Sequence, residues 1–223
     1  MEIEAEILKG GFMKTDINKI IDEYTKIYIN ILQSYYPAKR SVGFTERNQS
    51  VNFTKAIEKI YPTSFSWFEV PFEDKSKNHY DAMVIIPENK EIFIIESKRF
   101  SDGDMKVTSV GKDIMRIDNK KNILGAVESL ANSNEYSVYG VILADVWTVK
   151  PIKTRIRDTW NLKENNFFED ELFVKKLNLD EVMRDRFKKS VECMEQINIS
   201  NYVKTLSENS EYNLLICIWK TES

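Results

Sequence analysis

The sequence predicts an α/β (α+β) protein in which a central mixed β-sheet is flanked by helices. Two segments near the start of the chain, 16–36 and 45–61, repeat apolar residues at helical spacing. Three strand-like segments follow within 65–97, and two further apolar, β-branched segments stand at 137–144 and 212–219. Helix patterns that surround strand patterns in this way are typical of a sheet whose faces are covered by helices.

The two predicted helices have clear ends. Thr15 or Asp16 can cap the first helix, and Pro37 ends it, while the second helix (45–61) stops before another proline. The inward face of the second helix carries Glu46, Gln49, Phe53, Ala56, Ile57 and Ile60. Glu46 suits the first turn of a helix, but its face points at the sheet rather than at water.

The strand patterns predict a meander. Phe65–Phe72 is aromatic, and Pro71 within it favours an edge position. Tyr80–Ile86 and Glu91–Ser97 are apolar and β-branched, and the four residues 87–90 between them predict a hairpin loop.

The rest of the chain alternates between helix and strand patterns. Residues 105–131 are predicted to be mostly helical, and Ser137–Ala144 a buried strand. Residues 150–190 indicate a mixture of loop and helix, Glu181–Gln196 indicates a helix, and Tyr212–Trp219 a final buried strand.

The charge and the residue inventory exclude several classes of function. Acids number 35 against 32 Lys plus Arg, a net charge of −3, so the chain lacks the positive balance of a protein that coats nucleic acid. Its one histidine (His79) and two cysteines (Cys193 and Cys217) are too few for a His- or Cys-rich zinc site or a disulfide framework. With no signal-like start and no apolar run of the roughly 18 residues that span a membrane, we expect a cytoplasmic protein without membrane contact.

The predicted hairpin places two acids opposite each other. If Ile86 pairs with Glu91 around the loop, the register places Asp81 opposite Glu96, and alternation places Lys98 on the same face as Glu96. Opposed like charges destabilise a sheet, so the pair requires a compensating cation. Hard oxygen ligands suit Mg²⁺ best and Mn²⁺ next. A metal ion that is held by carboxylates beside a lysine is suited to activate a water molecule for attack on a phosphodiester.

The acid-x-Lys pattern alone is common in this chain. It also occurs at Glu73–Lys75, Glu88–Lys90, Asp104–Lys106 and Asp118–Lys120. Only Glu96-Ser97-Lys98 ends an apolar strand and has an acid opposite it on the preceding strand. The alternative interpretation of these residues is a structural ion-pair cluster.

At these residues the sequence resembles the PD-(D/E)XK nuclease superfamily, which has the restriction-endonuclease-like fold. The core of that family runs helix, three-stranded antiparallel meander, helix, strand, which is the predicted order over 45–144, about half of the chain. The family's first acid falls on Asp81, and its E-x-K motif falls on Glu96 and Lys98. The sequence departs from the pattern in having Tyr80 rather than proline before the first acid.

The resemblance implies a role for each residue. Asp81 and Glu96 would bind Mg²⁺, with the Ser97 carbonyl as a further ligand. Lys98 would position or deprotonate the attacking water and stabilise the phosphate in the transition state. Glu46 would contact the metal through water.

Candidate substrate contacts come from two basic stripes and two further residues. The first stripe is Lys150, Lys153, Arg155 and Arg157, and the second is Lys112, Arg116 and Lys120 at helical spacing. His79 and Gln49 complete the set. For each stripe the alternative is an ordinary solvated face.

Together these features predict a Mg²⁺-dependent endodeoxyribonuclease that cuts double-stranded DNA, as a Type II restriction or phage-defence enzyme and, by analogy, as a homodimer. We expect one nuclease domain over 1–223, with an N-terminal helical element (1–40), the core (45–149) and a C-terminal extension (150–223) that is a candidate for DNA contact or dimerisation. One alternative is a repair, recombination or mobile-element nuclease acting on DNA or RNA. Another is a non-catalytic module that binds DNA or a protein.

Overall fold

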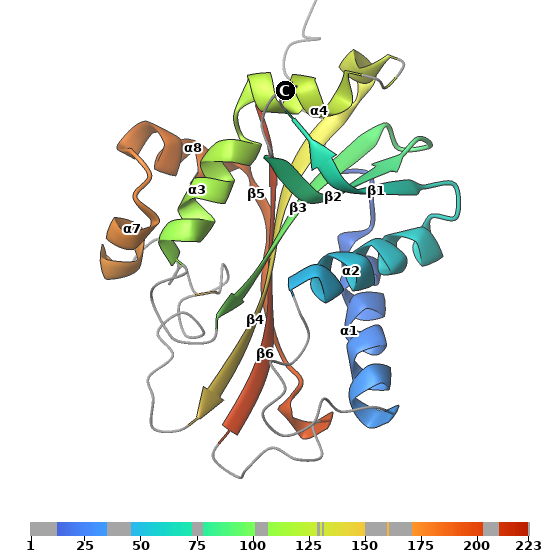
Figure 1. Cartoon of the computed structure of the whole chain (residues 1–223), viewed down its shortest axis with the longest axis vertical. Helices are drawn as coiled ribbons and strands as arrows, with labels where there is room; N and C mark the ends of the chain where they lie inside the picture. The colour runs from blue at the N-terminus through green and yellow to red at the C-terminus, as the bar shows by residue number, and fades with distance from the viewer. Residues whose placement is uncertain are drawn as a thin grey trace, which may run out of the picture.

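The computed structural model describes residues 13–34, 46–72, 78–100, 107–128, 130, 132–149, 160, 171–202 and 210–222, which form one six-stranded mixed sheet with helices on both faces (Figure 1). The strands are β1 (Phe65–Pro71), β2 (His79–Ile86), β3 (Glu91–Phe100), β4 (Ser137–Val149), β5 (Val191–Asn198) and β6 (Ser210–Lys220). The helices are α1 (Ile17–Ser34), α2 (Glu46–Ile60), α3 (Val107–Ile117), α4 (Lys120–Val127), α7 (Glu171–Leu177) and α8 (Glu181–Ser190), with short 3₁₀ turns η2 (Ser133–Glu135) and η3 (Ser200–Tyr202). Among these residues, none of the helices has both the length and the apolar composition needed to cross a membrane.

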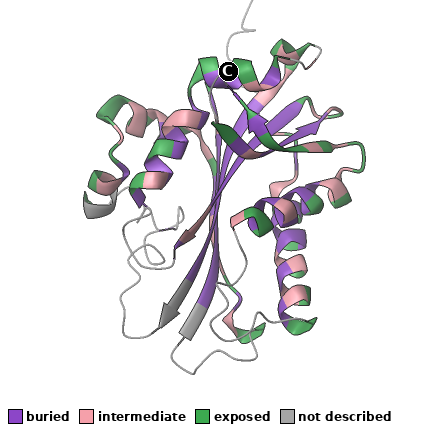
Figure 2. Cartoon of the chain, in the orientation of Figure 1, coloured by how far each residue is buried: buried purple, intermediate pink, exposed green. Residues whose placement is uncertain are grey.

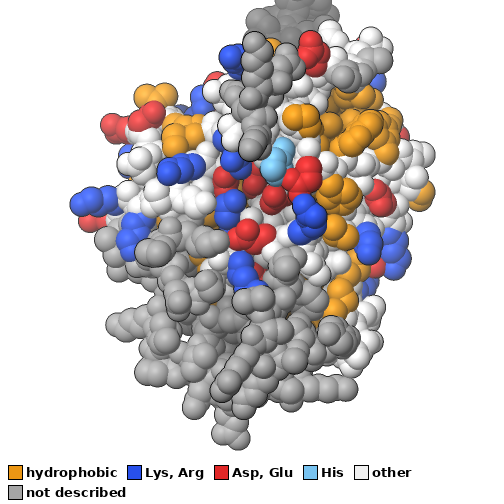
Figure 3. All heavy atoms as spheres, in the orientation of Figure 1, with side chains coloured by type: hydrophobic (Ala, Val, Ile, Leu, Met, Phe, Trp, Pro, Cys, Tyr) orange, Lys and Arg blue, Asp and Glu red, His pale blue; other side chains and the backbone are white. Residues whose placement is uncertain are grey.

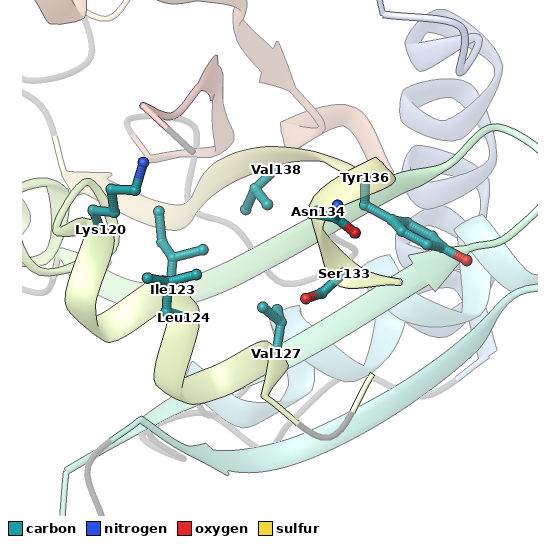
Figure 4. A pocket seen from close by; sticks show the side chains of 8 residues that line it. All are labelled: Lys120, Ile123, Leu124, Val127, Ser133, Asn134, Tyr136 and Val138. Carbon is teal, nitrogen blue, oxygen red and sulfur yellow. The ribbon is translucent and has the colours of Figure 1, made fainter. Parts of the chain in front are cut away.

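The strand order confirms the predicted architecture. The order in the sheet is β1-β2-β3-β4-β6-β5, with β1 at one edge as predicted. The first three strands form an antiparallel meander, β4 lies parallel to β3, and β6 is antiparallel to both β4 and β5. A parallel step requires a crossover, and α3 and α4 form it. Ile123, Leu124 and Val127 of α4 line a pocket with Val138 of β4 (Figure 4). The predicted order of helix, meander, helix and strand over 45–144 is therefore present.

The sheet separates two hydrophobic cores. On one face, α1 and α2 pack Tyr24 and Phe53 against strand residues such as Ile95. On the other face, Ile114 of α3 and Phe187 of α8 pack against the opposite side chains of the sheet. Figure 2 shows the central strands buried and the outer faces of the helices exposed. Burial on both faces explains why the central strands are almost continuously apolar in sequence.

The register predicted for the β2–β3 hairpin is confirmed. Ile86 pairs with Glu91, and the pairing continues to Ala82 opposite Ile95. Residues 87–90 form the turn. This register brings together the two strand ends that carry the predicted acids.

The C-terminal part of the sheet differs from the prediction. The sequence predicts one helix over Glu181–Gln196, and this is wrong, because α8 ends at Ser190 and residues 191–198 form β5. The edge of β6 offers hydrogen-bond partners, and Met194 becomes buried there. The stability gained from this pairing and burial outweighs the weak helix propensity of residues 191–198. β4 also extends to Val149, beyond its predicted end.

Gly140 in β4 offers a test of this packing. A methyl group there would lie 2.3 Å from the ring of Trp219 on β6, which is fully buried. We expect Gly140→Ala to lower the free energy of unfolding by about 1–3 kcal/mol, measured by chemical denaturation, because the ring has little space into which to move. In a double-mutant cycle the substitution should cost less beside Trp219→Phe, and an equal cost in both backgrounds would contradict this contact.

Candidate active site

The predicted acid Asp81 lies where β2 and β3 stop pairing as a regular ladder. Backbone pairing ends at Ala82 opposite Ile95, and Asp81 Oδ2 accepts a hydrogen bond from the Ser97 N–H at 2.7 Å. A side chain thus takes the place of a backbone acceptor between the two strands. The Asp81 carboxylate is held against β3, directly beside the predicted Glu96–Lys98 motif.

Glu96 and Lys98 both contact α3 across one face of the sheet. The Lys98 Nζ lies 2.7 Å from Asp113 Oδ2 and 3.8 Å from Glu96 Oε2. The Arg116 Nη2 lies 2.5 Å from Glu96 Oε1 and 2.8 Å from Asp113 Oδ1. Two cations and two carboxylates therefore alternate in one cluster, and Glu96 within it is only 2 % exposed.

Asp113 is a member of this cluster that is not among the predicted site residues. It is buried on α3 beside the apolar residues Val110, Ile114 and Ile117, which face the sheet. An acid on the apolar stripe of a helix is the sequence signal that could have found it. The same signal singles out Glu46 on α2.

With Asp81 beside it, the cluster brings three carboxylates near two cations. Burial raises the pKa of Glu96 to about 8, and the nearby carboxylates of Asp81 and Asp113 add to this rise. Burial also raises the pKa of Asp81. Burial alone would lower the pKa of Lys98, but the Asp113 carboxylate reverses this and raises it, so that the ammonium form is kept. Both acids thus resist ionisation while the lysine stays charged.

On the opposite face of the sheet, α2 contacts the same strand end. One Glu46 carboxylate oxygen accepts a hydrogen bond from the Arg99 N–H at 3.1 Å. The hydroxyls of Ser50 and Ser97 lie 2.6 Å apart, and both side chains are buried. After burial itself, the Glu46 carboxylate is one of the charges that raise the pKa of Asp81. The structure therefore brings Glu46 to the candidate site, as predicted.

Gln49 has a different place from the predicted one. It is fully buried, and its Nε2 donates hydrogen bonds to the Lys98 carbonyl and to Asp145 Oδ1, both at 3.0 Å. Asp145 on β4 also accepts a hydrogen bond from the Tyr212 hydroxyl, and burial raises the pKa of this acid to about 6. A substrate does not reach such a side chain, so the expected substrate contact is corrected. Gln49 fixes the main chain of β3 instead.

The remaining predicted substrate contacts lie in different parts of the structure. His79 is exposed at the start of β2, where its Nε2 pairs with Glu69. The stripe of Lys112, Arg116 and Lys120 does not lie on one helix, because α3 ends and α4 begins within it. Arg116 joins the acid cluster, whereas Lys112 stays exposed. Outside the described residues lie Lys150, Lys153, Arg155 and Arg157.

The donor set fits a divalent cation. Within the described ranges, no group of three or more His, Cys, Asp or Glu side chains is arranged so that it could hold a metal ion. The predicted set has two side chains, Asp81 and Glu96, with the Ser97 carbonyl, and such oxygen donors suit Mg²⁺ or Mn²⁺. Among the described residues, no Lys or Arg forms a close ion pair with Asp81, although the charge of Lys98 lowers its pKa in part. A dication would supply the missing charge and lower the pKa of both acids.

Figure 3 shows acidic and basic side chains gathered around the single histidine on one face of the molecule. No protein-family model, no curated protein and no solved structure matches the chain. The geometry of the site therefore carries the functional proposal.

The raised pKa of Glu96 predicts a pH-dependent stability. Its ordinary pKa is 4.5, whereas the folded protein raises it to about 8. The protonated carboxyl thus stabilises the fold at acidic pH, and this stability is lost as the pH rises through that interval. We expect Glu96→Gln, which cannot ionise, to gain free energy of unfolding relative to wild type over the same interval, by up to about 5 kcal/mol.

Denaturation in EDTA at several pH values measures this gain. Glu135→Gln, which removes an exposed acid paired with Lys90, is the matched control. A difference between Glu96→Gln and wild type that stays constant with pH would contradict the assignment.

Proposed function

We propose that the protein is a Mg²⁺-dependent endonuclease that hydrolyses DNA phosphodiester bonds, with Mn²⁺ as a substitute metal. The observation that supports this most directly is the convergence of Asp81, Glu96 and Lys98 at the interrupted end of the β2–β3 ladder. The resemblance to PD-(D/E)XK nucleases predicts this same convergence. Buried carboxylates with raised pKa values are costly for stability and are typical of functional sites.

Each residue of the site has a role in this proposal. Asp81 and Glu96 would hold the cation together with the Ser97 carbonyl, and Glu46, whose charge raises the pKa of Asp81, would take part through water. When bound, the cation supplies a Lewis acid that activates water and polarises the phosphate. The charged Lys98 orients the attacking water and stabilises the negative charge that develops on the phosphate.

The contacts of Lys98 favour this role over proton abstraction. Its Nζ is 2.7 Å from an Asp113 carboxylate oxygen, which keeps the proton on the amine. Arg116 bridges Asp113 and Glu96 and so limits the movement of the whole cluster. α3 thus acts as a support that sets the charge state and position of the groups on β3.

The proposal includes two biological settings. The first is a Type II restriction or phage-defence enzyme that cuts double-stranded DNA as a homodimer, one strand per subunit. The second is a nuclease of repair, recombination or mobile elements that acts on structured DNA or on RNA. A non-catalytic DNA- or protein-binding module is less consistent with a costly buried acid cluster. The free, buried cysteines at 193 and 217 favour a cytoplasmic setting.

Cleavage assays test the proposal directly. Purified protein should cut plasmid and linear DNA with Mg²⁺ or Mn²⁺ and should lose this activity in EDTA. Lys98→Ala should reduce the cleavage rate by about 100-fold or more, because it removes charge stabilisation in the transition state. Discrete fragments would favour the restriction setting, and smearing would favour a less specific nuclease.

A matched variant controls for the loss of a paired lysine. Lys90→Ala removes a lysine that pairs with Glu135 at the far end of the same hairpin, and it should leave the rate unchanged. Circular dichroism confirms that both variants fold. If wild-type protein cleaves neither DNA nor RNA with any divalent metal, the enzyme proposal is wrong.

Asp113 predicts a change in the pH–rate profile. Its carboxylate raises the pKa of Lys98, so Asp113→Asn should shift the limb that reports Lys98 deprotonation to lower pH. Asp118→Asn is the control, because Asp118 follows α3 closely but pairs with Arg186 instead. The cleavage rate as a function of pH measures both variants, and an unshifted limb in Asp113→Asn would show that Asp113 does not tune Lys98.

A further inference from the structure

Arg116 is bound differently to its two partners in the acid cluster. Its Nη2 donates a hydrogen bond to Asp113 Oδ1 at 2.8 Å. The same nitrogen lies 2.5 Å from Glu96 Oε1, but this contact lacks hydrogen-bond geometry, and Glu96 Oε1 has no hydrogen-bond partner among the described residues. The contact with Glu96 is therefore the weaker of the two, because a charged donor binds most strongly when it is aligned with its acceptor.

The Glu96 oxygen that Arg116 contacts belongs to a proposed metal ligand. The other oxygen of this side chain, Oε2, lies 3.8 Å from Lys98 Nζ, so each oxygen has a cation near it. A divalent cation bound by Glu96 brings two further positive charges next to the guanidinium, and like charges repel. Arg116 and a divalent cation therefore compete for Glu96.

The side chain of Arg116 can turn while its main chain stays in place. Its carbonyl oxygen accepts hydrogen bonds from the Tyr80 hydroxyl at 3.2 Å and from Asn122 Nδ2 at 3.0 Å, and these bonds fix the end of α3. The side chain itself is 31 % exposed, compared with 3 % for Glu96. The buried Arg116 Nε has no hydrogen-bond partner among the described residues. The guanidinium thus has a donor left for another acceptor.

We propose that Arg116 is a phosphate-binding residue that exchanges Glu96 for a phosphate of the substrate when a divalent cation binds. Once Glu96 is a metal ligand, Arg116 stays on Asp113 and turns its remaining donors to the phosphate, for which a planar guanidinium is well suited. This inference rests on the proposed nuclease function and deepens it, because it assigns a substrate contact that forms only in the metal-bound protein.

A second arginine provides a matched comparison. Arg186 of α8 is 32 % exposed and pairs with Asp118, whose side chain is 5 % exposed, and with Glu222. Both of its contacts have hydrogen-bond geometry, unlike the contact between Arg116 and Glu96. Neither of its partners is a proposed metal ligand. Arg186→Gln therefore controls for the loss of an arginine that is paired with a buried acid.

Metal binding without DNA tests the competition for Glu96. Electron paramagnetic resonance measures free Mn²⁺ during a titration of the protein. We expect Arg116→Gln to bind Mn²⁺ several-fold more tightly than wild type, because the positive charge beside Glu96 is gone. Burial raises the pKa of Glu96 and the charge of Arg116 lowers it in part, so the substitution also favours a proton there, but a doubly charged cation gains more.

Arg186→Gln should bind Mn²⁺ as wild type does, and circular dichroism confirms that the variants fold. Unchanged or weaker Mn²⁺ binding by Arg116→Gln would overturn the exchange.

DNA binding tests the phosphate contact. Fluorescence anisotropy measures the affinity for a labelled DNA duplex in EDTA and in Ca²⁺, which also binds oxygen ligands, and gel electrophoresis confirms that the DNA stays intact. Arg116→Gln should weaken binding about tenfold in Ca²⁺ and reduce its salt dependence, since a charge-assisted hydrogen bond contributes about this much. It should change binding little in EDTA, and Arg186→Gln should change neither affinity. An equal loss in Ca²⁺ and in EDTA would overturn the metal-dependent contact.

Two further measurements decide the question if Arg116→Gln does not fold. Arg116→Lys keeps the positive charge and should bind Mn²⁺ as wild type does, so tighter binding by this variant would contradict the competition. In wild-type protein, the guanidinium NMR signal of Arg116, identified by its absence in Arg116→Lys, should shift on addition of Mg²⁺ more than that of Arg186. An Arg116 signal that does not respond to Mg²⁺ overturns the exchange.

The outcomes separate this inference from the nuclease proposal. If wild-type protein cleaves DNA with Mg²⁺ but Arg116→Gln binds Mn²⁺ and DNA as wild type does, only the inference about Arg116 fails. If Arg116→Gln shows both expected changes but wild-type protein cleaves neither DNA nor RNA, only the nuclease proposal fails. Wild-type protein that binds no divalent cation overturns both.

Discussion

The register between β2 and β3 is the constraint on which the candidate site depends. Because Ile86 pairs with Glu91, every later pair is fixed, and the acids of the two strands meet where the ladder ends. A shift of one residue would turn the side chains of one strand to the other face and separate them. The apolar residues of both strands prevent this shift, since they are buried against helices on each side. The two hydrophobic cores therefore fix the position of the acids.

The interruption of the ladder follows from the acids themselves. Asp81 replaces a backbone acceptor by taking the Ser97 N–H, and Glu96 remains buried beside it. Such a pair would repel and unfold the strand ends unless cations offset its charge. Lys98 and Arg116 offset part of it, while burial, and after it the charges of Asp81 and Asp113, raise the pKa of Glu96 to about 8. The stability of this region is thus linked to protons and, under the proposed function, to a divalent cation.

Much of this arrangement follows from local sequence signals. The hairpin register and the E-x-K strand come from alternation and turn length, and the helix over 46–60 comes from its apolar period. The sequence does not predict the role of Asp113, because its partner Lys98 is brought to it only by the crossover between β3 and β4. The sequence does not predict β5 either, because residues 191–198 become a strand only where they can pair with the edge of β6. The buried place of Gln49 is set by Asp145 on β4, nearly one hundred residues away in sequence. Long-range packing, which no local pattern encodes, decides these three cases.

The two layers of helices have different tasks at the site. On one face, α2 holds main-chain groups of β3 through Glu46 and Gln49, so it sets where the strand end lies. On the other face, α3 holds charged side chains through Asp113 and Arg116, so it sets their protonation. Neither task requires contact with a substrate. The supports therefore approach from both faces of the sheet, and the interrupted strand ends lie between them.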